Sequence, residues 1–193
     1  MGRAGSGARL REGALAFGYR VRSPARLTIC VITHIMDRMV RQLRDEIRQT
    51  KPFASLEQEV VLSLGRTWAL LDHGFAEALK PYGITPTQYN VLRILRGAGE
   101  AGLCRAEITE RMLTRVPDVT RLLDRLEAVG LITRERDAVD RRYVTARITE
   151  KGLALLEELE ELVLEMHRGP CSALNPSEQR ALIDMLARIR AAL

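Results

Sequence analysis

The side chains best suited to chemistry in this sequence are arginine, aspartate and threonine residues gathered between positions 115 and 142. One group surrounds the start and outer face of an expected short helix: Arg115, Asp118, Thr120, Arg121 and Arg125. A second group lies on an expected hairpin: Arg134, Arg136, Asp140, Arg141 and Arg142. Arginine bonds guanine or phosphate, threonine bonds phosphate, and aspartate accepts from cytosine N4. These residue types in this pattern indicate double-stranded DNA as a partner.

Both groups also allow a structural interpretation. Arg121 and Asp124 lie three residues apart and could form an ion pair on a solvated helix face. Asp118 falls in the first helical turn, where an acidic side chain interacts favourably with the helix dipole. Near phosphate its charge would be unfavourable unless it caps the helix or reads a base. The arginines of the hairpin could pair with Asp137 and Asp140.

The order of the elements around these residues favours DNA binding. Helices are expected over residues 103–113 and 117–129, and Gly130 ends the second helix. Strands are expected over 131–136 and 142–148, joined by a charged turn at 137–140. This is the order of a helix-turn-helix followed by a β-wing. The second helix would enter the major groove, and arginines at the wing tip would enter the minor groove.

Amphipathic helices are expected on both sides of this segment, so the fold class is mainly α with a small β-wing. The helices cover about 36–49, 55–80, 86–96, 149–167 and 176–193. Capping patterns begin at Ser55, Thr85 and Asn175, and Gly169-Pro170 is expected to end the fourth helix. The apolar stripes of the second, fourth and fifth helices exceed what one small lobe can bury, which indicates a partner chain.

The basic character of the chain comes from its first residues. The net charge is +5, and residues 1–38 contain seven arginines against two acidic residues, so the remainder is neutral. Bulk charge is therefore no argument for DNA binding; only the local placement of arginine is. Residues 1–35 are expected to be a disordered basic tail, to lie before a native start at Met36 or Met39, or to form a basic arm on the DNA backbone.

Other classes of function find little support. The cysteines Cys30, Cys104 and Cys171 form no CxxC pair, which fits a reducing cytoplasm, and Cys30 with His34 is too few ligands for a metal site. No apolar run approaches the ~20 residues of a membrane span. The chain has three histidines and none of the common nucleotide-binding or hydrolase motifs. We therefore expect no enzyme, no cofactor, no metal and no membrane partner.

The segment TRLLDRLEAVGLITRERDAVDRRYVTARITEKG resembles the MarR family of bacterial transcription regulators. The family's wing pattern is Asp-x-Arg, five residues, then Leu-Thr; here Asp140-Arg141-Arg142 precedes YVTAR and Ile148-Thr149, with Ile in place of Leu. The preceding block T-R-x-x-D-R-L-x-x-x-G-L matches residues 120–131. The resemblance covers about residues 55–193.

This resemblance implies a homodimer whose N- and C-terminal helices interlock, so that two recognition helices address a pseudo-palindromic operator. Asp140 and Arg142 would brace the wing, and Arg141 or Arg142 would reach the minor groove. Many members release DNA when a small aromatic compound binds between the dimer helices and the DNA-binding lobe. The candidate residues for such a ligand pocket are Trp68, Asp72, Phe75 and Tyr82, although Trp68 and Phe75 also fit core packing.

The expected organisation is therefore a tail at 1–35, N-terminal dimerisation helices at 36–84, a winged helix-turn-helix lobe at 85–149 and C-terminal dimerisation helices at 150–193. The expected function is a sequence-specific transcription regulator, a ligand-responsive repressor. The alternative is a protein-interaction or dimeric sensor module with a degenerate winged helix and weak DNA binding. Asp118 and the neutral charge of residues 39–193 keep that alternative open.

Overall fold

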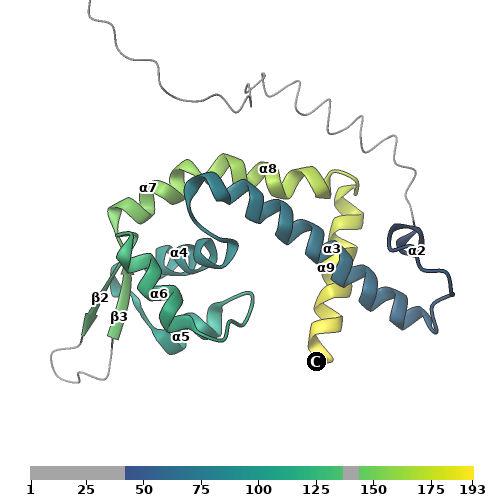
Figure 1. Ribbon diagram of the computed structural model, residues 1–193, viewed down its shortest axis with the longest axis horizontal. Coiled ribbons are helices and arrows are strands. Elements are labelled where there is room, and N and C mark those ends of the chain that lie inside the picture. Colours follow the sequence, from purple (N-terminus) through teal and green to yellow (C-terminus); the bar gives the residue numbers. More distant parts are fainter. Residues whose placement is uncertain (1–41, 137–143) are drawn as a thin grey trace, which may run out of the picture. The chain divides into compact units, whose positions relative to one another are not determined.

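The structure is a computed structural model that describes residues 42–136 and 144–193 (Figure 1). The chain divides into two units, Met1–Val60 and Val61–Leu193, and the boundary falls within helix α3 (Leu56–Leu79). In the described part of the first unit, α2 (Leu43–Glu46) is a single helical turn. The expected helix over 36–49 is thus confirmed only in part, because its residues before 42 lie outside the described ones.

Ser55 begins α3, as the capping pattern predicts. Its Oγ accepts a hydrogen bond of 3.2 Å from the backbone N–H of Gln58. The Gln58 side chain reaches back one residue further than expected and accepts from the N–H of Ala54 at 2.7 Å. The helix ends at Leu79, next to the 3₁₀ turn η1 (Lys80–Tyr82). Pro81 lies in that turn and has no backbone N–H with which to continue the α-helix.

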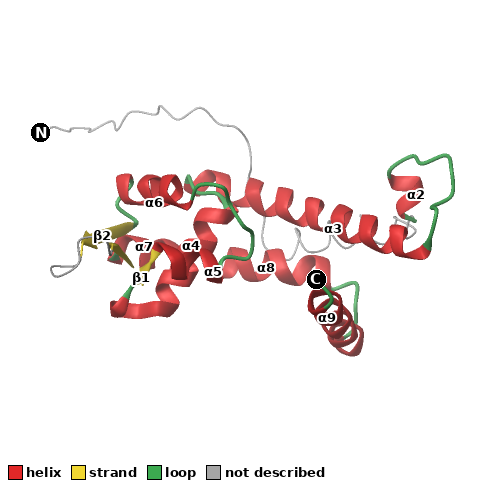
Figure 2. Cartoon of the chain, turned by 90° about the horizontal axis from the view of Figure 1, so that it is seen from below, coloured by secondary structure: helices red, strands yellow, loops and turns green. Residues whose placement is uncertain are grey.

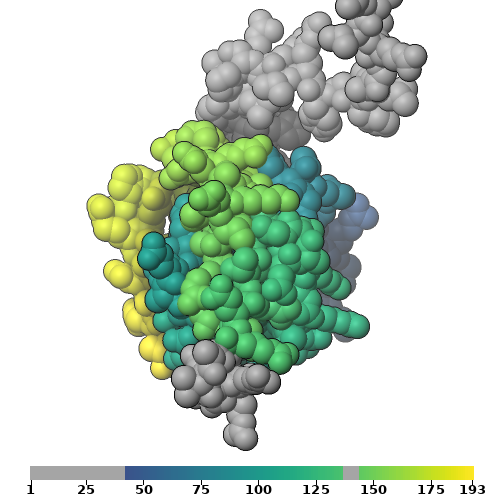
Figure 3. All heavy atoms as spheres, turned by 90° about the vertical axis from the view of Figure 1, so that its left-hand side faces the viewer, coloured from purple at the N-terminus to yellow at the C-terminus, as the bar shows by residue number. Residues whose placement is uncertain are grey.

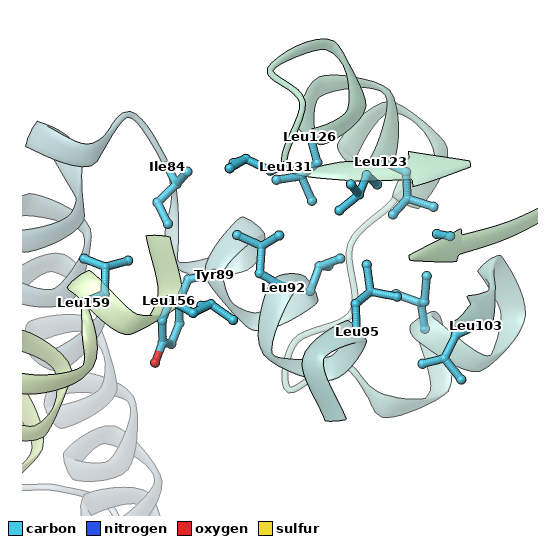
Figure 4. Packing of buried hydrophobic residues seen from close by; sticks show 14 of the residues in the cluster. Ile84, Tyr89, Leu92, Leu95, Leu103, Leu123, Leu126, Leu131, Leu156 and Leu159 are labelled. Atoms are coloured by element: carbon cyan, nitrogen blue, oxygen red, sulfur yellow. The ribbon is translucent and has the colours of Figure 1, made fainter. Parts of the chain in front are cut away.

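Helix α4 (Pro86–Ala98) is the centre of the second unit. A complete capping box begins it: Thr85 Oγ1 accepts from the N–H of Gln88 at 3.2 Å, and Gln88 Oε1 accepts from the N–H of Thr85 at 2.9 Å. Its apolar face is buried, and Leu92 and Leu95 are completely inaccessible to solvent. Figure 4 shows these two side chains among leucines from the surrounding elements. The apolar core of the unit is therefore built around α4.

A three-stranded antiparallel sheet lies beside these helices, in the order β1-β3-β2. Its strands are β1 (Leu103–Cys104), β2 (Ile132–Arg136) and β3 (Val144–Ile148). In the β2–β3 ladder, Ile132 pairs with Ile148 and Arg136 with Val144. The expected wing strands are confirmed over 132–136 and 144–148. Residues 137–143, which include the expected turn at 137–140, lie outside the described ones.

The expected helix over 103–113 is too long at its start. Residues 103 and 104 pair with β3, and α5 (Arg105–Arg111) begins only after them. Gly102 makes this approach feasible: its φ is +65°, and a Cβ there would lie 2.6 Å from the carbonyl oxygen of Ala146. Pairing with a distant strand has overridden the local helical pattern.

Helix α6 (Val119–Ala128) starts two residues later than expected, because Asp118 is its N-cap residue and is not itself helical. Three of its side chains, Val119, Leu123 and Leu126, are buried. They join Ile108 of α5 and the side chains of α4 in one apolar core. Figures 1 and 2 both show α6 beside the strands of the second unit, so one core fixes α4, α5, α6 and the sheet together.

The C-terminal region holds α7 (Glu150–Glu158), α8 (Glu160–Cys171) and α9 (Pro176–Ala191). Thr149 caps α7 and Asn175 caps α9 with a full capping box, as expected. Two expectations about the helix over 149–167 are wrong. It is interrupted at Leu159, which separates α7 from α8, and Gly169-Pro170 does not end α8. Pro170 lies in the last turn, where the missing N–H removes a single hydrogen bond just before the helix stops.

Several large apolar side chains on α3 and α9 remain exposed. Trp68 is 55% exposed, so its expected burial in the core is wrong for the single chain. Helix α9 has no buried residue, and Ile183 and Met185 are at least half exposed. Among the described residues, no helix combines the length and the apolar character that crossing a membrane would require.

Candidate nucleic-acid interface

The recognition-helix candidates lie on the solvent-facing side of α6. Thr120, Arg121 and Arg125 are exposed, while the opposite side of the helix is buried in the core. Figure 3 shows the side of the second unit that carries β2 and β3, where the surface of the helix-turn-helix segment, drawn in green, is accessible to solvent. The structure therefore brings these three side chains together on one accessible helix face.

Asp118 acts as the N-cap of α6. Its Oδ1 accepts from the backbone N–H of Arg121 at 2.9 Å, which satisfies one of the amides left without a partner at a helix start. Its Oδ2 lies 3.9 Å from Arg121 Nε, and both side chains are more than half exposed. Such an exposed pair contributes little. The structural interpretation of Asp118 is thus observed directly, whereas base reading is a proposal.

Arg115 is exposed in the connection between α5 and α6. This connection is anchored on α4, because the N–H of Leu113 donates to Asn90 Oδ1 at 3.1 Å. The Leu113 side chain itself is 82% exposed. This hydrogen bond, together with the packing of Met112 and Val116 against the core, holds the segment that carries Arg115.

The wing is described only at its base. Arg136 is exposed at the end of β2. Asp140, Arg141 and Arg142 lie outside the described residues, and their expected roles stay predictions.

Arg134 has an environment unlike that of the other interface candidates that the structure describes. Its Nη2 lies 2.6 Å from Asp124 Oδ1 and 2.6 Å from Glu127 Oε2, and its Nε donates to Glu127 Oε2 at 2.9 Å. Its backbone N–H donates to Glu127 Oε1 at 3.1 Å. The Glu127 carboxylate, and to a smaller extent Asp124, raises the pKa of Arg134. The sequence spacing suggested that Asp124 could pair with Arg121. In the structure Asp124 pairs with Arg134 instead.

Sequence reasoning missed a second arginine at the base of the wing. Arg147 on β3 donates from Nε to the carbonyl oxygen of Glu100 at 2.7 Å and from Nη1 to Glu135 Oε2 at 2.7 Å. It thus ties β3 to β2 and to the turn η2 (Gly99–Ala101). The alternation of β3 placed Arg147 on the polar side of the strand, but no local pattern marks Glu100 as its partner.

Sequence comparison places this arrangement among known proteins. The model of the MarR family matches residues 82–142. The HTH-type transcriptional regulator YkoM of Bacillus subtilis (strain 168) is 31% identical over 141 residues, which cover 70% of this chain and 90% of YkoM. The chain belongs to the MarR family. The proteins of this family found here are transcription regulators and not enzymes.

Solved structures of MarR-family regulators share the fold. The DNA complex of MepR from S. aureus matches with a TM-score of 0.62 and 28% identity, covering 68% of this chain and 96% of MepR. Bordetella bronchiseptica BpsR, whose DNA binding is regulated by 6-hydroxynicotinic acid, matches with a TM-score of 0.62 and 25% identity. That match covers 68% of this chain and 98% of BpsR.

The expected ligand residues of this MarR-family chain are only partly gathered. The four residues differ in their exposure to solvent. Trp68 and Asp72 are exposed on α3, whereas Phe75 and Tyr82 pack against the core. Phe75 makes an edge-to-face contact with Tyr89, with ring centroids 5.3 Å apart.

A hollow of about 360 Å³ lies elsewhere, between α5, α6 and the sheet. Its lining residues are Cys104, Arg105, Ala106, Thr120, Leu123, Arg134, Val144 and Ala146.

Metal and thiol chemistry gain no support from the described residues. Within 42–136 and 144–193, no group of three or more His, Cys, Asp or Glu side chains is arranged to hold a metal ion. Cys104 is half-buried and Cys171 is exposed, and both are free thiols. The pair Cys30 and His34 lies outside the described residues.

Proposed function

We propose that this MarR-family chain is a sequence-specific DNA-binding repressor that binds a pseudo-palindromic operator as a homodimer. The observation that carries the proposal is the geometry of α6. Asp118 caps its start, the core fixes its buried side, and Thr120, Arg121 and Arg125 project from its exposed side. A helix held in this way can place its first residues against base edges in the major groove.

DNA as the partner is supported by a relative whose structure was solved in complex with DNA. MepR was determined as a DNA complex, and this chain shares its fold over most of MepR's length. In the present chain, α6 would read bases, while Arg115 and Arg136 would contact phosphate from the flanking connection and the wing. Arg141 or Arg142 would reach the minor groove. Phosphate contacts should dominate the affinity and make it sensitive to salt.

A second copy of the chain is supported by apolar surface that the monomer leaves exposed. Large apolar side chains are exposed on α3 and α9: Val61, Leu62, Trp68, Leu70, Leu71, Leu182, Ile183, Met185 and Ile189. Apolar surface of this extent on terminal helices is costly in water and is characteristic of an interface. Two copies related by a twofold axis would present two α6 helices to a palindromic site.

A small aromatic effector is the proposed signal. BpsR provides the precedent, because 6-hydroxynicotinic acid regulates its DNA binding. In this chain Trp68, Asp72, Phe75 and Tyr82 would form the pocket, with the partner copy covering the two exposed members. The chain has one tryptophan, so its fluorescence reports on Trp68 alone. Titration with 6-hydroxynicotinic acid and simple phenols should change this fluorescence and release DNA; no change in either would contradict the proposal.

Selection from a pool of random DNA duplexes tests the proposed function most broadly. The full chain should enrich a palindromic sequence, and Arg121→Ala should weaken binding to it. Tight binding that Arg141→Ala and Arg142→Ala leave unchanged would refute the role of the wing. Failure to enrich any sequence, together with weak binding that does not depend on sequence, would favour the protein-interaction module instead.

A further inference from the structure

The ion pairs that join α6 to β2 occupy one of the side chains expected to contact DNA. We propose that Asp124, Glu127 and Arg134, here called the α6–β2 clamp, set the position of the wing relative to the recognition helix. Arg134 is then a positioning residue and not a DNA contact. This inference rests on the proposed function, because it assigns the clamp a role in binding DNA.

The contacts of the clamp hold both the side chain and the backbone of β2. Asp124 and Glu127 are three residues apart and so lie on the same side of α6. Glu127 accepts from the Arg134 guanidinium through Oε2 and from the Arg134 backbone N–H through Oε1. Asp124 Oδ1 contacts the same guanidinium at 2.6 Å. One strand residue is therefore held at three donor atoms by two helix residues.

Burial separates Arg134 from the arginines that are free to meet DNA. Its side chain is 21% exposed, compared with 77% for Arg121. To bond a phosphate through Nε or Nη2, Arg134 would have to leave these carboxylates. Those carboxylates would then stand unpaired near the DNA backbone, where negative charge is repelled. The arrangement therefore favours retention of the internal contacts when DNA is bound.

The clamp also lies where a positional constraint has most effect. Residues 129–131 connect α6 to β2, and β2 leads directly into the wing. A two-stranded ribbon twists readily unless it is fixed at its base. Arg147 fixes β3 to β2 and to η2 through Glu135 and Glu100, whereas Arg134 ties β2 to α6. Because α6 and the wing address different grooves, the angle between them decides whether both can bind at once.

This role can be distinguished from a phosphate contact by the sign of a charge change. Asp124→Asn and Glu127→Gln each remove one negative charge from the DNA-binding lobe. If electrostatic attraction alone mattered, both variants would bind DNA more tightly. If the clamp positions the wing, both should bind the operator less tightly although the protein has become more positive. Glu110→Gln, at an exposed position on α5, removes the same charge outside the clamp and is the matched control.

The experiment measures the affinity of the full chain for two probes, the duplex that it selects from a random pool and an unrelated duplex of equal length. We expect Glu127→Gln to weaken binding to the selected duplex about tenfold, with unchanged or slightly tighter binding to the unrelated one. Asp124→Asn, which loses one contact, should weaken it less. Arg134→Lys should also weaken it, since an ammonium cannot reproduce the forked contact. Glu110→Gln should show no loss of selectivity.

A measurement without DNA tests the structural half of the inference separately. Hydrogen exchange of the backbone amides of residues 132–136 and 144–148 should be faster in Glu127→Gln and Asp124→Asn, while the amides of α4 keep their wild-type rates. This pattern also shows that the variants are folded. The inference is overturned if strand exchange is unchanged. It is equally overturned if the clamp variants and Glu110→Gln tighten binding to both duplexes alike. Failure of the wild-type chain to select any duplex would instead overturn the proposed function, whatever the exchange rates.

Discussion

Replacement of Asp118 separates two roles that one carboxylate could have at the start of α6. As an N-cap, it accepts from the Arg121 N–H at 2.9 Å. As a DNA contact, it would accept from a cytosine amino group. Asp118→Asn keeps an acceptor for the cap and removes the charge, whereas Asp118→Ala removes both. The two variants together therefore distinguish the capping role from the charge and from base reading.

The expected magnitudes follow from the geometry of the cap. Loss of a side-chain N-cap costs about 1 kcal/mol of stability, and Asn caps about as well as Asp. Asp118→Ala should therefore lower the free energy of unfolding by about 1 kcal/mol and the melting temperature by about 2–4 °C. Asp118→Asn should change either quantity very little. Asn175→Ala removes the cap of α9, which accepts from two backbone N–H groups within a capping box, and should cost at least as much.

Removal of the Asp118 charge should strengthen DNA binding slightly, whereas removal of the cap weakens folding. The carboxylate is more than half exposed, so water screens it. At about 6–10 Å from a phosphate in high dielectric, its removal gains about 0.4–0.7 kcal/mol, and salt reduces this further. Asp118→Asn should therefore tighten binding about twofold on any duplex.

Chemical denaturation and fluorescence anisotropy with the selected and unrelated duplexes measure these two quantities. A selective loss would refute the reasoning. In that case Asp118→Asn would bind the selected duplex about tenfold or more weakly and would lose its base preference at one position, while its affinity for the unrelated duplex stayed unchanged. Asp118 would then be a base-reading residue as well as a cap.

Three further variants test the lobe, the interface and the dimer. Gly102→Ala should lower the free energy of unfolding, measured by chemical denaturation, by at least about 1 kcal/mol more than Gly99→Ala. Both glycines have a positive φ, but only at position 102 would a Cβ lie 2.6 Å from the carbonyl oxygen of Ala146. Equal losses would show that this crowding is unimportant. Arg136→Gln should weaken binding to all duplexes and reduce the slope of log K against log salt by about 1, because Arg136 is a proposed phosphate contact. An unchanged slope would exclude that contact. Ile183→Glu should reduce the mass measured by light scattering from dimer to monomer; an unchanged dimer would place the interface elsewhere.

The helices and wing could be predicted because their signals are local. Thr85 and Asn175 form the capping boxes that the sequence pattern indicates, since cap and amide lie within one turn. The buried face of α6 follows from the spacing of Val119, Leu123 and Leu126 in the same way. These features depend on neighbouring residues alone.

The remaining features depend on residues that are distant in sequence. Leu103 and Cys104 look helical by pattern, but β3 captures them as a strand. The break between α7 and α8 falls at Leu159, whose side chain is completely buried in the core, and Pro170 lies within the last turn of α8. No spacing rule indicates these outcomes.

The candidate interface shows the same division between local and distant signals. Arg121 and Arg125 are exposed as their helix periodicity predicts. Arg134 has the right type and the right strand, but its side chain turns toward Asp124 and Glu127. The sequence indicated which arginines gather near the wing, whereas the ion pairs determine which of them remain free.

The most direct test of the account is the mass and the footprint of the complex with the selected duplex. Light scattering should give two chains per duplex, and hydroxyl-radical cleavage should show two symmetric protected segments centred about one helical turn, or a multiple of it, apart. Protection should extend into the minor groove beyond each half-site, where the wing would lie. A complex with one chain, or a footprint without twofold symmetry, would contradict a homodimer that uses α6 and the wing to read a palindrome.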